Sequence, residues 1–318
     1  MFSVFVIRRG AMILALGSLS ALAVFGSDEG AKRPGYYREP AVHGDMLIFT
    51  SEGDLWSVSV EGGAAHRLTS APGQERFSTI SPDGKTVAFY AQYEGPSEVY
   101  TIPIGGGIPQ RQTWDNDAKP VGWKPDGRLM IETGRYATLP DPNLVLIGSD
   151  GAREMLPLAT GSEACYSDDG KTLFFTRFDK QWSNTKRYKG GFIQNLWRYD
   201  GKGEAVALTS DFAGTSHAPM FWKGRVYFLS DRDGVMNVWS MDPKGHGLKE
   251  ESHQKLFDVQ TASVSEGRIV YASGGDLWSL DLGSGREAVI PITLVSDFDQ
   301  LRDAELARVV FDIDTALR

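Results

Sequence analysis

Six pairs of neighbouring apolar residues recur along the chain, each within a short segment of alternating apolar and polar positions. The second members of successive pairs lie 44, 45, 52, 42 and 39 residues apart. Alternation is typical of half-buried strands, and a period of about 40–50 residues with strand content is typical of propeller blades. The pattern predicts an all-β fold, a six-bladed β-propeller of four-stranded antiparallel blades. The pairs are Leu55-Trp56, Val99-Tyr100, Leu144-Val145, Leu196-Trp197, Val238-Trp239 and Leu277-Trp278.

The second repeat shows the four expected strands of a blade most clearly. They are residues 77–80, 86–90, 98–102 and 109–113. A Pro-Asp-Gly turn joins the first two, because proline presets φ, aspartate bonds to its own backbone and glycine accepts a positive φ. Related turns precede an apolar strand in the other repeats. We expect no helix of useful length before residue 296.

The first and last repeats determine how the ring closes. Residues 40–42 supply an inner strand for the first blade, and residues 288–292 supply an outer strand for the sixth. Each blade then contains all of its own strands, so no strand is left to cross the seam. We expect a propeller over residues 37–293, closed by side-chain packing alone, and a connector with a tail over residues 294–318.

The N-terminal residues have the pattern of an export signal. Arg8 and Arg9 precede an uncharged apolar run at residues 11–25, as in secretory signal peptides. The run is shorter than the roughly 20 residues of a membrane-spanning helix. We expect a signal peptide at 1–26, a polar leader at 27–36 and a periplasmic or secreted protein without a stable membrane span. The alternatives are an uncleaved anchor, or a buried strand in a cytoplasmic protein.

Charge and cysteine content narrow the function classes. The formal net charge is −8 and the pI about 5.2, which argues against nucleic acid as a partner, because such binding depends on Lys and Arg at phosphates. The single cysteine, Cys165, excludes an internal disulfide framework. We expect it to be a small buried strand residue.

The sequence offers no catalytic, metal or cofactor site. It has no Gly-x-Ser-x-Gly nucleophile motif, and Ser216 and His217 would point to opposite faces of a strand. Its five histidines lack metal-ligand spacing. The sequence Asp231-Arg232-Asp233-Gly234 lacks the other ligands of a calcium loop and predicts a hairpin turn.

Two loops are longer than a blade needs, and we treat their basic and aromatic residues as candidates for substrate or partner contact. Residues 179–192 account for the 52-residue interval and contain Arg187, Tyr188 and Lys189. Residues 134–142 contain Arg135. The first of these, a basic loop on an acidic protein, could hold an acidic partner or a peptide carboxylate, but the favoured alternative is that it packs against a neighbouring domain.

Arg232, in the turn described above, is a further contact candidate. The recurring tryptophans, in contrast, are expected in the core between blades rather than at a ligand. They are Trp56, Trp197, Trp239 and Trp278.

Four segments of the chain resemble the first propeller of tricorn-type proteases. They are residues 187–191 (RYKGG), 219–234 (PMFWKGRVYFLSDRDG), 274–278 (GGDLW) and 294–302 (LVSDFDQLR). The last is similar to the connector between that family's six-bladed and seven-bladed propellers. The resemblance covers roughly residues 36–302.

The resemblance implies a part in oligopeptide degradation without catalysis by this chain. The family's catalytic residues lie downstream of a second propeller, and residues 303–312 do not resemble that propeller's opening strand. We therefore expect a truncated or split product, or a fragment, without peptidase activity. Basic residues of this propeller are thought to hold a peptide's C-terminal carboxylate in the family, and Arg135 is the guess for that role.

Three hypotheses follow for the function. The leading one is a non-catalytic gating and docking module of an exported tricorn-like serine peptidase, whose partners are peptides or downstream protease domains, with a possible homo-oligomer at full length. The second is a Tol-system-like periplasmic protein-binding propeller. The third is the propeller of a prolyl-oligopeptidase-type enzyme, which the connector argues against.

Overall fold

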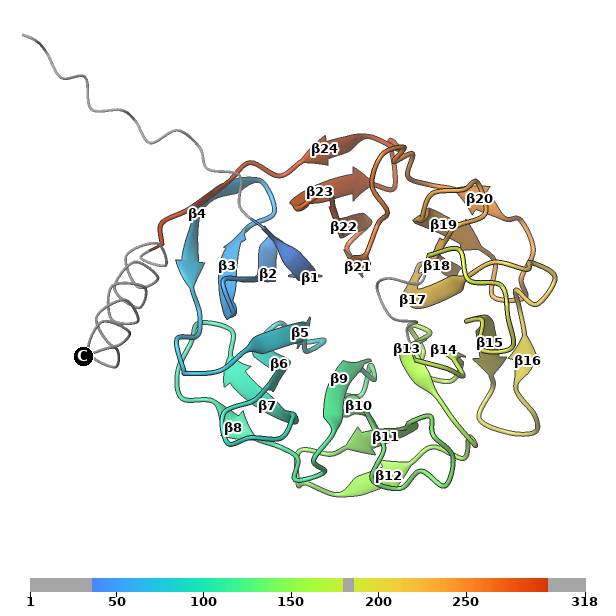
Figure 1. Cartoon of the computed structure of the whole chain (residues 1–318), viewed down its shortest axis with the longest axis horizontal. Coiled ribbons are helices and arrows are strands. Elements are labelled where there is room, and N and C mark those ends of the chain that lie inside the picture. The colour runs from blue at the N-terminus through green and yellow to red at the C-terminus, as the bar shows by residue number, and fades with distance from the viewer. Residues whose placement is uncertain (1–35, 180–185, 297–318) are drawn as a thin grey trace, which may run out of the picture. The chain divides into compact units, whose positions relative to one another are not determined.

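The computed structural model describes residues 36–179 and 186–296, which form six β-sheets arranged around a common axis (Figure 1). The expected signal peptide, most of the polar leader and most of the connector lie outside these residues. No helix occurs in the described part, so it holds none long and apolar enough to cross a membrane. The six-bladed propeller predicted from the sequence is confirmed.

Each blade is a four-stranded antiparallel sheet whose strands follow one another from the axis outward. The innermost strands are β1 (Arg38–His43), β5 (Glu75–Ile80), β9 (Ala118–Trp123), β13 (Ser162–Tyr166), β17 (Ser216–Trp222) and β21 (Thr261–Ser265). The second strands are β2 (Met46–Ser51), β6 (Thr86–Ala91), β10 (Leu129–Thr133), β14 (Leu173–Thr176), β18 (Arg225–Ser230) and β22 (Arg268–Ser273). The third strands are β3 (Asp54–Ser59), β7 (Glu98–Pro103), β11 (Asn143–Ile147), β15 (Leu196–Tyr199), β19 (Asn237–Met241) and β23 (Asp276–Asp281). The outer strands are β4 (Gly62–Arg67), β8 (Gln110–Arg111), β12 (Arg153–Met155), β16 (Val206–Ala207), β20 (Lys249–Glu250) and β24 (Glu287–Val289).

The hydrophobic core lies between the blades. Buried side chains form one cluster at each of the six interfaces between neighbouring blades. All six apolar pairs found in the sequence fall in third strands, and the recurring tryptophans belong to these clusters. Trp56 is 2% exposed and donates its indole N–H to the Ser51 carbonyl at 3.0 Å. The sequence-based assignment of these tryptophans to the core is confirmed.

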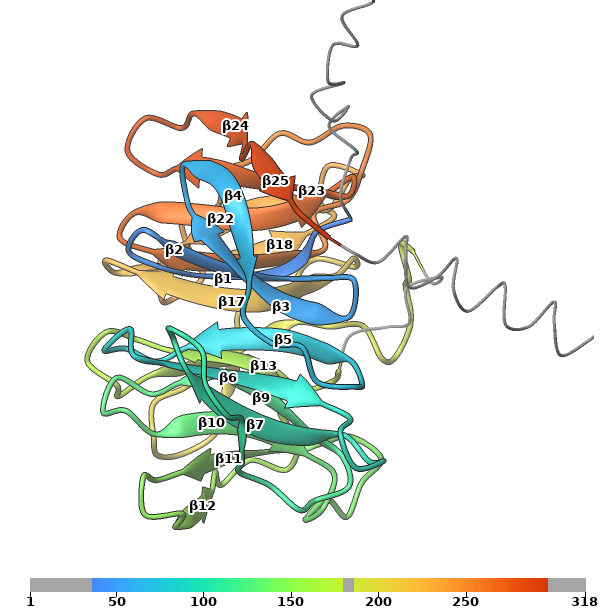
Figure 2. The same ribbon diagram turned by 90° about the vertical axis from the view of Figure 1, so that its left-hand side faces the viewer.

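The seam between the first and sixth blades differs from the expectation. A short strand, β25 (Ile292–Leu294), leaves the sixth blade and pairs in parallel with β4 on the outer edge of the first (Figure 2). Ile290 and Ile292 enter the core cluster of that interface. The prediction of closure by side-chain packing alone is therefore wrong, because backbone hydrogen bonds also tie the seam.

Two features of β4 explain how it accepts this fifth strand. It has six residues, whereas the outer strands of the other five blades have two or three, and short outer edges resist pairing. It also begins with Gly62 at φ +91°, where a side chain would collide with Pro291. The adjacent amide of Gly63 donates to the Pro291 carbonyl at 2.9 Å.

Candidate functional site

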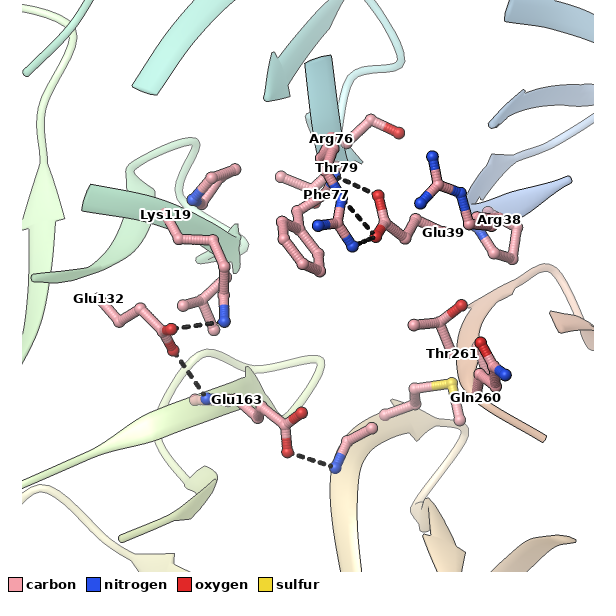
Figure 3. A pocket seen from close by; sticks show the side chains of 18 of the residues that line it. Arg38, Glu39, Arg76, Phe77, Thr79, Lys119, Glu132, Glu163, Gln260 and Thr261 are labelled. Atoms are coloured by element: carbon pink, nitrogen blue, oxygen red, sulfur yellow. Dashed lines mark hydrogen bonds and ion pairs between the residues drawn. The ribbon is translucent and has the colours of Figure 1, made fainter. Parts of the chain in front are cut away.

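A central cavity of about 580 Å³ lies on the propeller axis and is lined by the innermost strands of all six blades (Figure 3). This volume falls within the ordinary range for ligand pockets, about 300–1,000 Å³. Because every blade contributes to the wall, the cavity is a property of the closed ring rather than of any one blade.

The inner strands present irregular backbone to the cavity. Five of the six are interrupted by a β-bulge or register shift, and β21 is the exception. Four bulges place a non-glycine residue at positive φ, at 53°, 51°, 32° and 50°, for Glu39, Phe77, Glu163 and Ala218. Such residues cost about 1–3 kcal/mol each and are frequent at functional sites.

Carboxylates hold three of these bulges in place across blade interfaces. Glu39 accepts the amide N–H of Phe77 at 3.1 Å, and Glu132 accepts that of Glu163 at 3.4 Å. Glu163 in turn accepts the amide N–H of Ala218 at 3.2 Å. In each case the acceptor is on one blade and the strained residue is on the next. The pattern fixes the inner strands of neighbouring blades to one another.

Most charged groups on the cavity wall are paired. Arg76 forms an ion pair with Glu39, and His217 Nδ1 lies 3.1 Å from Glu163. Lys119 Nζ lies 2.5 Å from Glu132 and 3.6 Å from Asp179. Burial opposes the charge on Lys119, but these two carboxylates outweigh it and raise the pKa of the ammonium.

Arg38 differs from the other cations of the wall. Its guanidinium stacks on Tyr36 at 5.3 Å, and its Nε is buried without a hydrogen-bond partner among the described residues. The hydroxyls of Ser78 and Thr261, on the neighbouring blades, are buried and unpartnered in the same way. Arg38, Ser78 and Thr261 all line the cavity, and a guanidinium with a free donor can receive a carboxylate or another anion.

The part of the wall contributed by the fifth and sixth blades is neutral. The fifth and sixth blades contribute Ala218, Pro219, Met220 and residues 260–262. Ser216 lies 3.3 Å from the Ser230 hydroxyl, while His217 contacts Glu163. The two side chains thus have different partners, and the absence of a catalytic pair stays a prediction.

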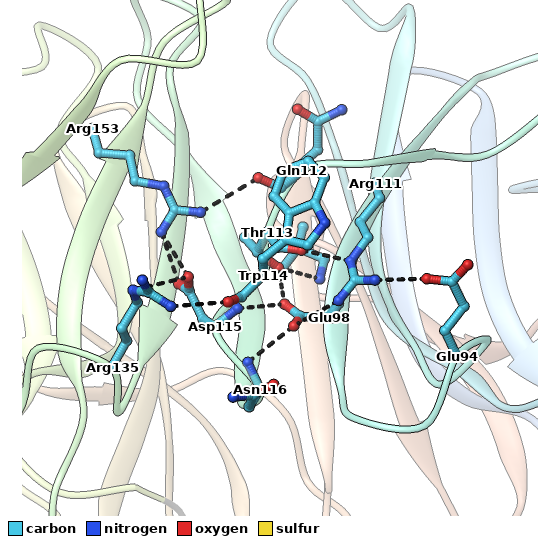
Figure 4. Close-up of polar contacts among 11 residues, drawn as sticks. Glu94, Glu98, Arg111, Gln112, Thr113, Trp114, Asp115, Asn116, Arg135 and Arg153 are labelled. Atoms are coloured by element: carbon cyan, nitrogen blue, oxygen red, sulfur yellow. Dashed lines mark hydrogen bonds and ion pairs between the residues drawn. The ribbon is translucent and has the colours of Figure 1, made fainter.

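Arg135 lies away from the cavity, in the loop between β10 and β11 (Figure 4). Its guanidinium donates to the Trp114 carbonyl at 3.0 Å and approaches Asp115 at 3.8 Å. Trp114 is 62% exposed and stacks on Arg111 at 5.4 Å. Arg135 thus sits in a surface cluster where the link between the second and third blades meets this loop.

The basic loop of the fourth blade reaches a different part of the ring. Arg187 and Lys186 both pair with Asp258 at 2.9 Å, on the link between the fifth and sixth blades. Burial disfavours the Asp258 carboxylate, but bonds from Arg187, the Met236 amide and Lys186 outweigh it and lower its pKa to about 2. The loop is therefore tied across the fifth blade. Tyr188 is half-buried and Lys189 exposed.

Arg232 packs into the fifth blade. Its guanidinium lies 4.5 Å from the Phe212 ring, and burial lowers its pKa despite Asp211 and Asp231 nearby. The Asp231 carbonyl accepts the Gly234 amide at 3.0 Å and Gly234 has a φ of +98°, as expected of a hairpin turn. The Asp231 carboxylate accepts the Thr215 amide at 2.8 Å. Cys165 lies on β13, where burial raises the pKa of its thiol.

The five candidate contact residues lie at three separate places on the propeller, and none lines the cavity. Their contact role stays a prediction. Sequence reasoning missed the cavity residues Arg38, Glu39, Lys119, Glu132 and Glu163. Proline in three of the six inner strands was the available signal, since proline in a strand favours an edge or a bulge.

The family described as "Tricorn protease N-terminal beta propeller domain" matches residues 34–286 of the chain. The chain belongs to this family. The tricorn resemblance read from the sequence is thus confirmed. The chain is 33% identical over 261 residues to "Tricorn protease homolog 1" of Streptomyces coelicolor. The aligned region covers 80% of the chain and 24% of that protein.

Structural similarity shows that the chain shares its fold with part of a tricorn protease. The crystal structure of the tricorn protease superposes with a TM-score of 0.76 at 22% identity, covering 83% of the chain and 27% of the protease. A "Putative Tricorn-like protease N-terminal subunit" of Sulfurisphaera tokodaii is 27% identical over 165 residues, covering 49% of the chain and 83% of that subunit. The chain spans about a quarter of the length of the full tricorn homologue in Streptomyces.

Proposed function

We propose that the chain is the non-catalytic, substrate-handling propeller of a tricorn-like serine peptidase that degrades oligopeptides. In this role the central cavity admits extended peptides and supplies them to protease domains on downstream residues or on a separate subunit. Relatives named as separate N-terminal and C-terminal subunits support such a division.

The unpaired Arg38 in the closed ring of inner strands is the observation that carries this proposal. A wide, open pore would favour no particular ligand, whereas this wall combines a neutral part from two blades with one guanidinium whose Nε lacks an acceptor. A charge-assisted hydrogen bond contributes about 1.5–3 kcal/mol. Arg38 therefore gives the cavity a preference for peptides with a carboxylate.

Binding of a fluorescein-labelled oligopeptide to the full chain, followed by anisotropy, tests the role of Arg38. We expect the Arg38→Met variant to bind a peptide with a free C-terminal carboxylate about tenfold more weakly or worse, from the lost charged hydrogen bonds. The matched control is Arg268→Met, because Arg268 pairs with Glu61 elsewhere on the propeller. That variant should bind like the parent.

Mass spectrometry of the same mixtures tests for catalysis. The peptide should remain intact, and turnover that survives further purification would refute a non-catalytic role. Equal binding of the peptide by the parent and by Arg38→Met would exclude Arg38 as the residue that binds the peptide carboxylate. Absence of peptide binding, with capture of a folded envelope protein instead, would favour the Tol-like docking alternative.

We also propose that the protein is exported to the periplasm or secreted. The support is the sequence alone: Arg8 and Arg9 followed by the apolar run at 11–25. Intact mass of the protein from the extracytoplasmic fraction should show removal of about 26 residues. An unprocessed chain found only in the cytoplasm would contradict export.

A further inference from the structure

The innermost strand of each blade has one edge that its own sheet leaves unpaired. An exposed edge with free N–H and C=O groups can add another strand, and proteins block this with prolines and bulges. Each inner strand contributes residues to the cavity wall, and β21 does so through Thr261 and Ala262, so an edge that lacks such a block can take an extended chain there.

Five of the six inner edges are blocked. The first, third and fifth blades combine a bulge or register shift with a proline, and the second and fourth have a bulge with a residue at positive φ. The blocking residues are Pro40, Pro120 and Pro219, with Phe77 and Glu163 in the other two blades.

The sixth inner strand, β21, has neither device. It pairs with β22 without interruption from Thr261 to Ser265, and all five of its residues are half-exposed. Its residues are small and uncharged. Counted from the hairpin turn, Ala262 stands where the first and fifth blades have Pro40 and Pro219.

The register identifies the free backbone groups. Ser265 and Arg268 flank a two-residue turn in which Glu266 and Gly267 both have positive φ, the geometry in which the flanking pair is hydrogen-bonded. Along an antiparallel strand, the backbone N–H and C=O groups of one residue point toward the partner strand and those of the next residue point away from it. Ala262 and Val264 therefore point their N–H and C=O groups away from β22, and elsewhere in the described residues neither has a backbone partner.

We infer that an extended peptide in the cavity adds as a strand to the free edge of β21 at Ala262, the residue of that edge that lines the cavity. This inference rests on the proposed peptide-handling function and specifies its site and recognition mode. Main-chain pairing gives affinity for many sequences, and alternate side chains give selectivity.

The neighbouring blades define which side chains fit. A strand added to β21 extends the sixth sheet, so its side chains alternate between the first and fifth blades. On the first-blade side lies Arg38, and on the fifth-blade side lie Pro219 and Met220. The preferred substrate class is an extended peptide in which acidic and apolar residues alternate.

Backbone methylation of the peptide tests the pairing directly. The probe is labelled Ala-Glu-Val-Glu-Val-Thr, titrated into the full chain. N-methyl groups on both glutamate amides or on both valine amides block opposite edges of the same strand. One of these two peptides should bind at least tenfold more weakly than the parent, while the other stays within about threefold.

A pair of protein variants gives the second arm. Ala262→Pro removes one free donor without touching the β22 ladder, and Ala262→Ser keeps that donor. We expect Ala262→Pro to bind the parent peptide at least tenfold more weakly and Ala262→Ser to bind normally. Circular dichroism and urea unfolding of Ala262→Pro confirm that the propeller is folded.

The outcomes separate this inference from the proposed function. If the parent peptide binds and both methylated forms bind equally well, or both lose binding equally, strand addition at β21 is wrong while peptide handling stands. If the parent peptide does not bind up to millimolar concentration, both are contradicted.

Discussion

Replacing Gly62 by alanine should open the ring at its seam. A Cβ at this position would lie 2.5 Å from the Pro291 carbonyl oxygen and 2.8 Å from the Pro291 ring, at a backbone φ of +91°. Both obstacles are rigid, so the segment leading into β25 must move. We expect a loss of about 3 kcal/mol in the free energy of unfolding, from backbone strain and displaced pairing together.

Gly63→Ala is the matched control for this variant. Gly63 has a similarly positive φ of +111°, but nothing lies within 4 Å of its Cβ position. The free energy of unfolding of Gly63→Ala should fall by only about 1–2 kcal/mol, from backbone strain alone. Urea unfolding gives both values, and hydrogen exchange over residues 290–296 should rise only in Gly62→Ala. Equal losses without local exchange would show that β25 does not stabilise the seam.

Replacing Glu98 by alanine should destabilise the link between the second and third blades. The Glu98 side chain is 1% exposed and accepts bonds from Arg111, Thr113 and the amides of Asp115 and Asn116 (Figure 4). Truncation leaves the Thr113 hydroxyl and two amides without this acceptor and removes one of the two carboxylates that pair with Arg111. We expect a loss of about 3–5 kcal/mol in the free energy of unfolding.

The control is Glu94→Ala, which removes the other carboxylate that pairs with Arg111. The two atoms are 2.7 Å apart, but the Glu94 side chain is 72% exposed, so the loss should be below about 1 kcal/mol. Similar losses in the free energy of unfolding for Glu98→Ala and Glu94→Ala would contradict the claim that burial makes Glu98 the more important carboxylate.

The Glu98 carboxyl also gives a pH dependence with a definite sign. Burial raises its pKa, but hydrogen bonds from Thr113 and the two link amides outweigh burial, so the pKa lies below its ordinary value. Its contribution to stability is full above about pH 4.3, the ordinary glutamate pKa, and is lost as the pH falls through the depressed value. Glu98→Gln should unfold with a flatter pH profile below pH 4 than the parent, and an unchanged profile would contradict this.

The repeat could be predicted because one physical requirement recurs six times. Every blade needs an apolar third strand against its neighbours, so pairs such as Leu55-Trp56 and Leu277-Trp278 recur at blade spacing. The turns were predictable for the same reason, since glycine and aspartate satisfy local backbone geometry.

The cavity and the seam could not be predicted in this way. The cavity wall depends on bulges that shift the register by one residue, and nothing local marks Glu39 or Glu163 as partners of the next blade. Closure depends on β25, only three residues long, meeting a strand more than 220 positions earlier. Arg187 was recognised as unusual, but its partner Asp258 is 71 residues away.

Photo-crosslinking tests the central claim, that the axial cavity is where this propeller handles peptides, most directly. The probe is the labelled hexapeptide with a benzophenone side chain in place of one valine, irradiated with the full chain and mapped by peptide sequencing. The account predicts adducts on the inner strands, with Met220, Ala262 and Arg38 among the modified positions. Adducts confined to outer strands or to surface loops such as the one holding Arg135 would contradict it.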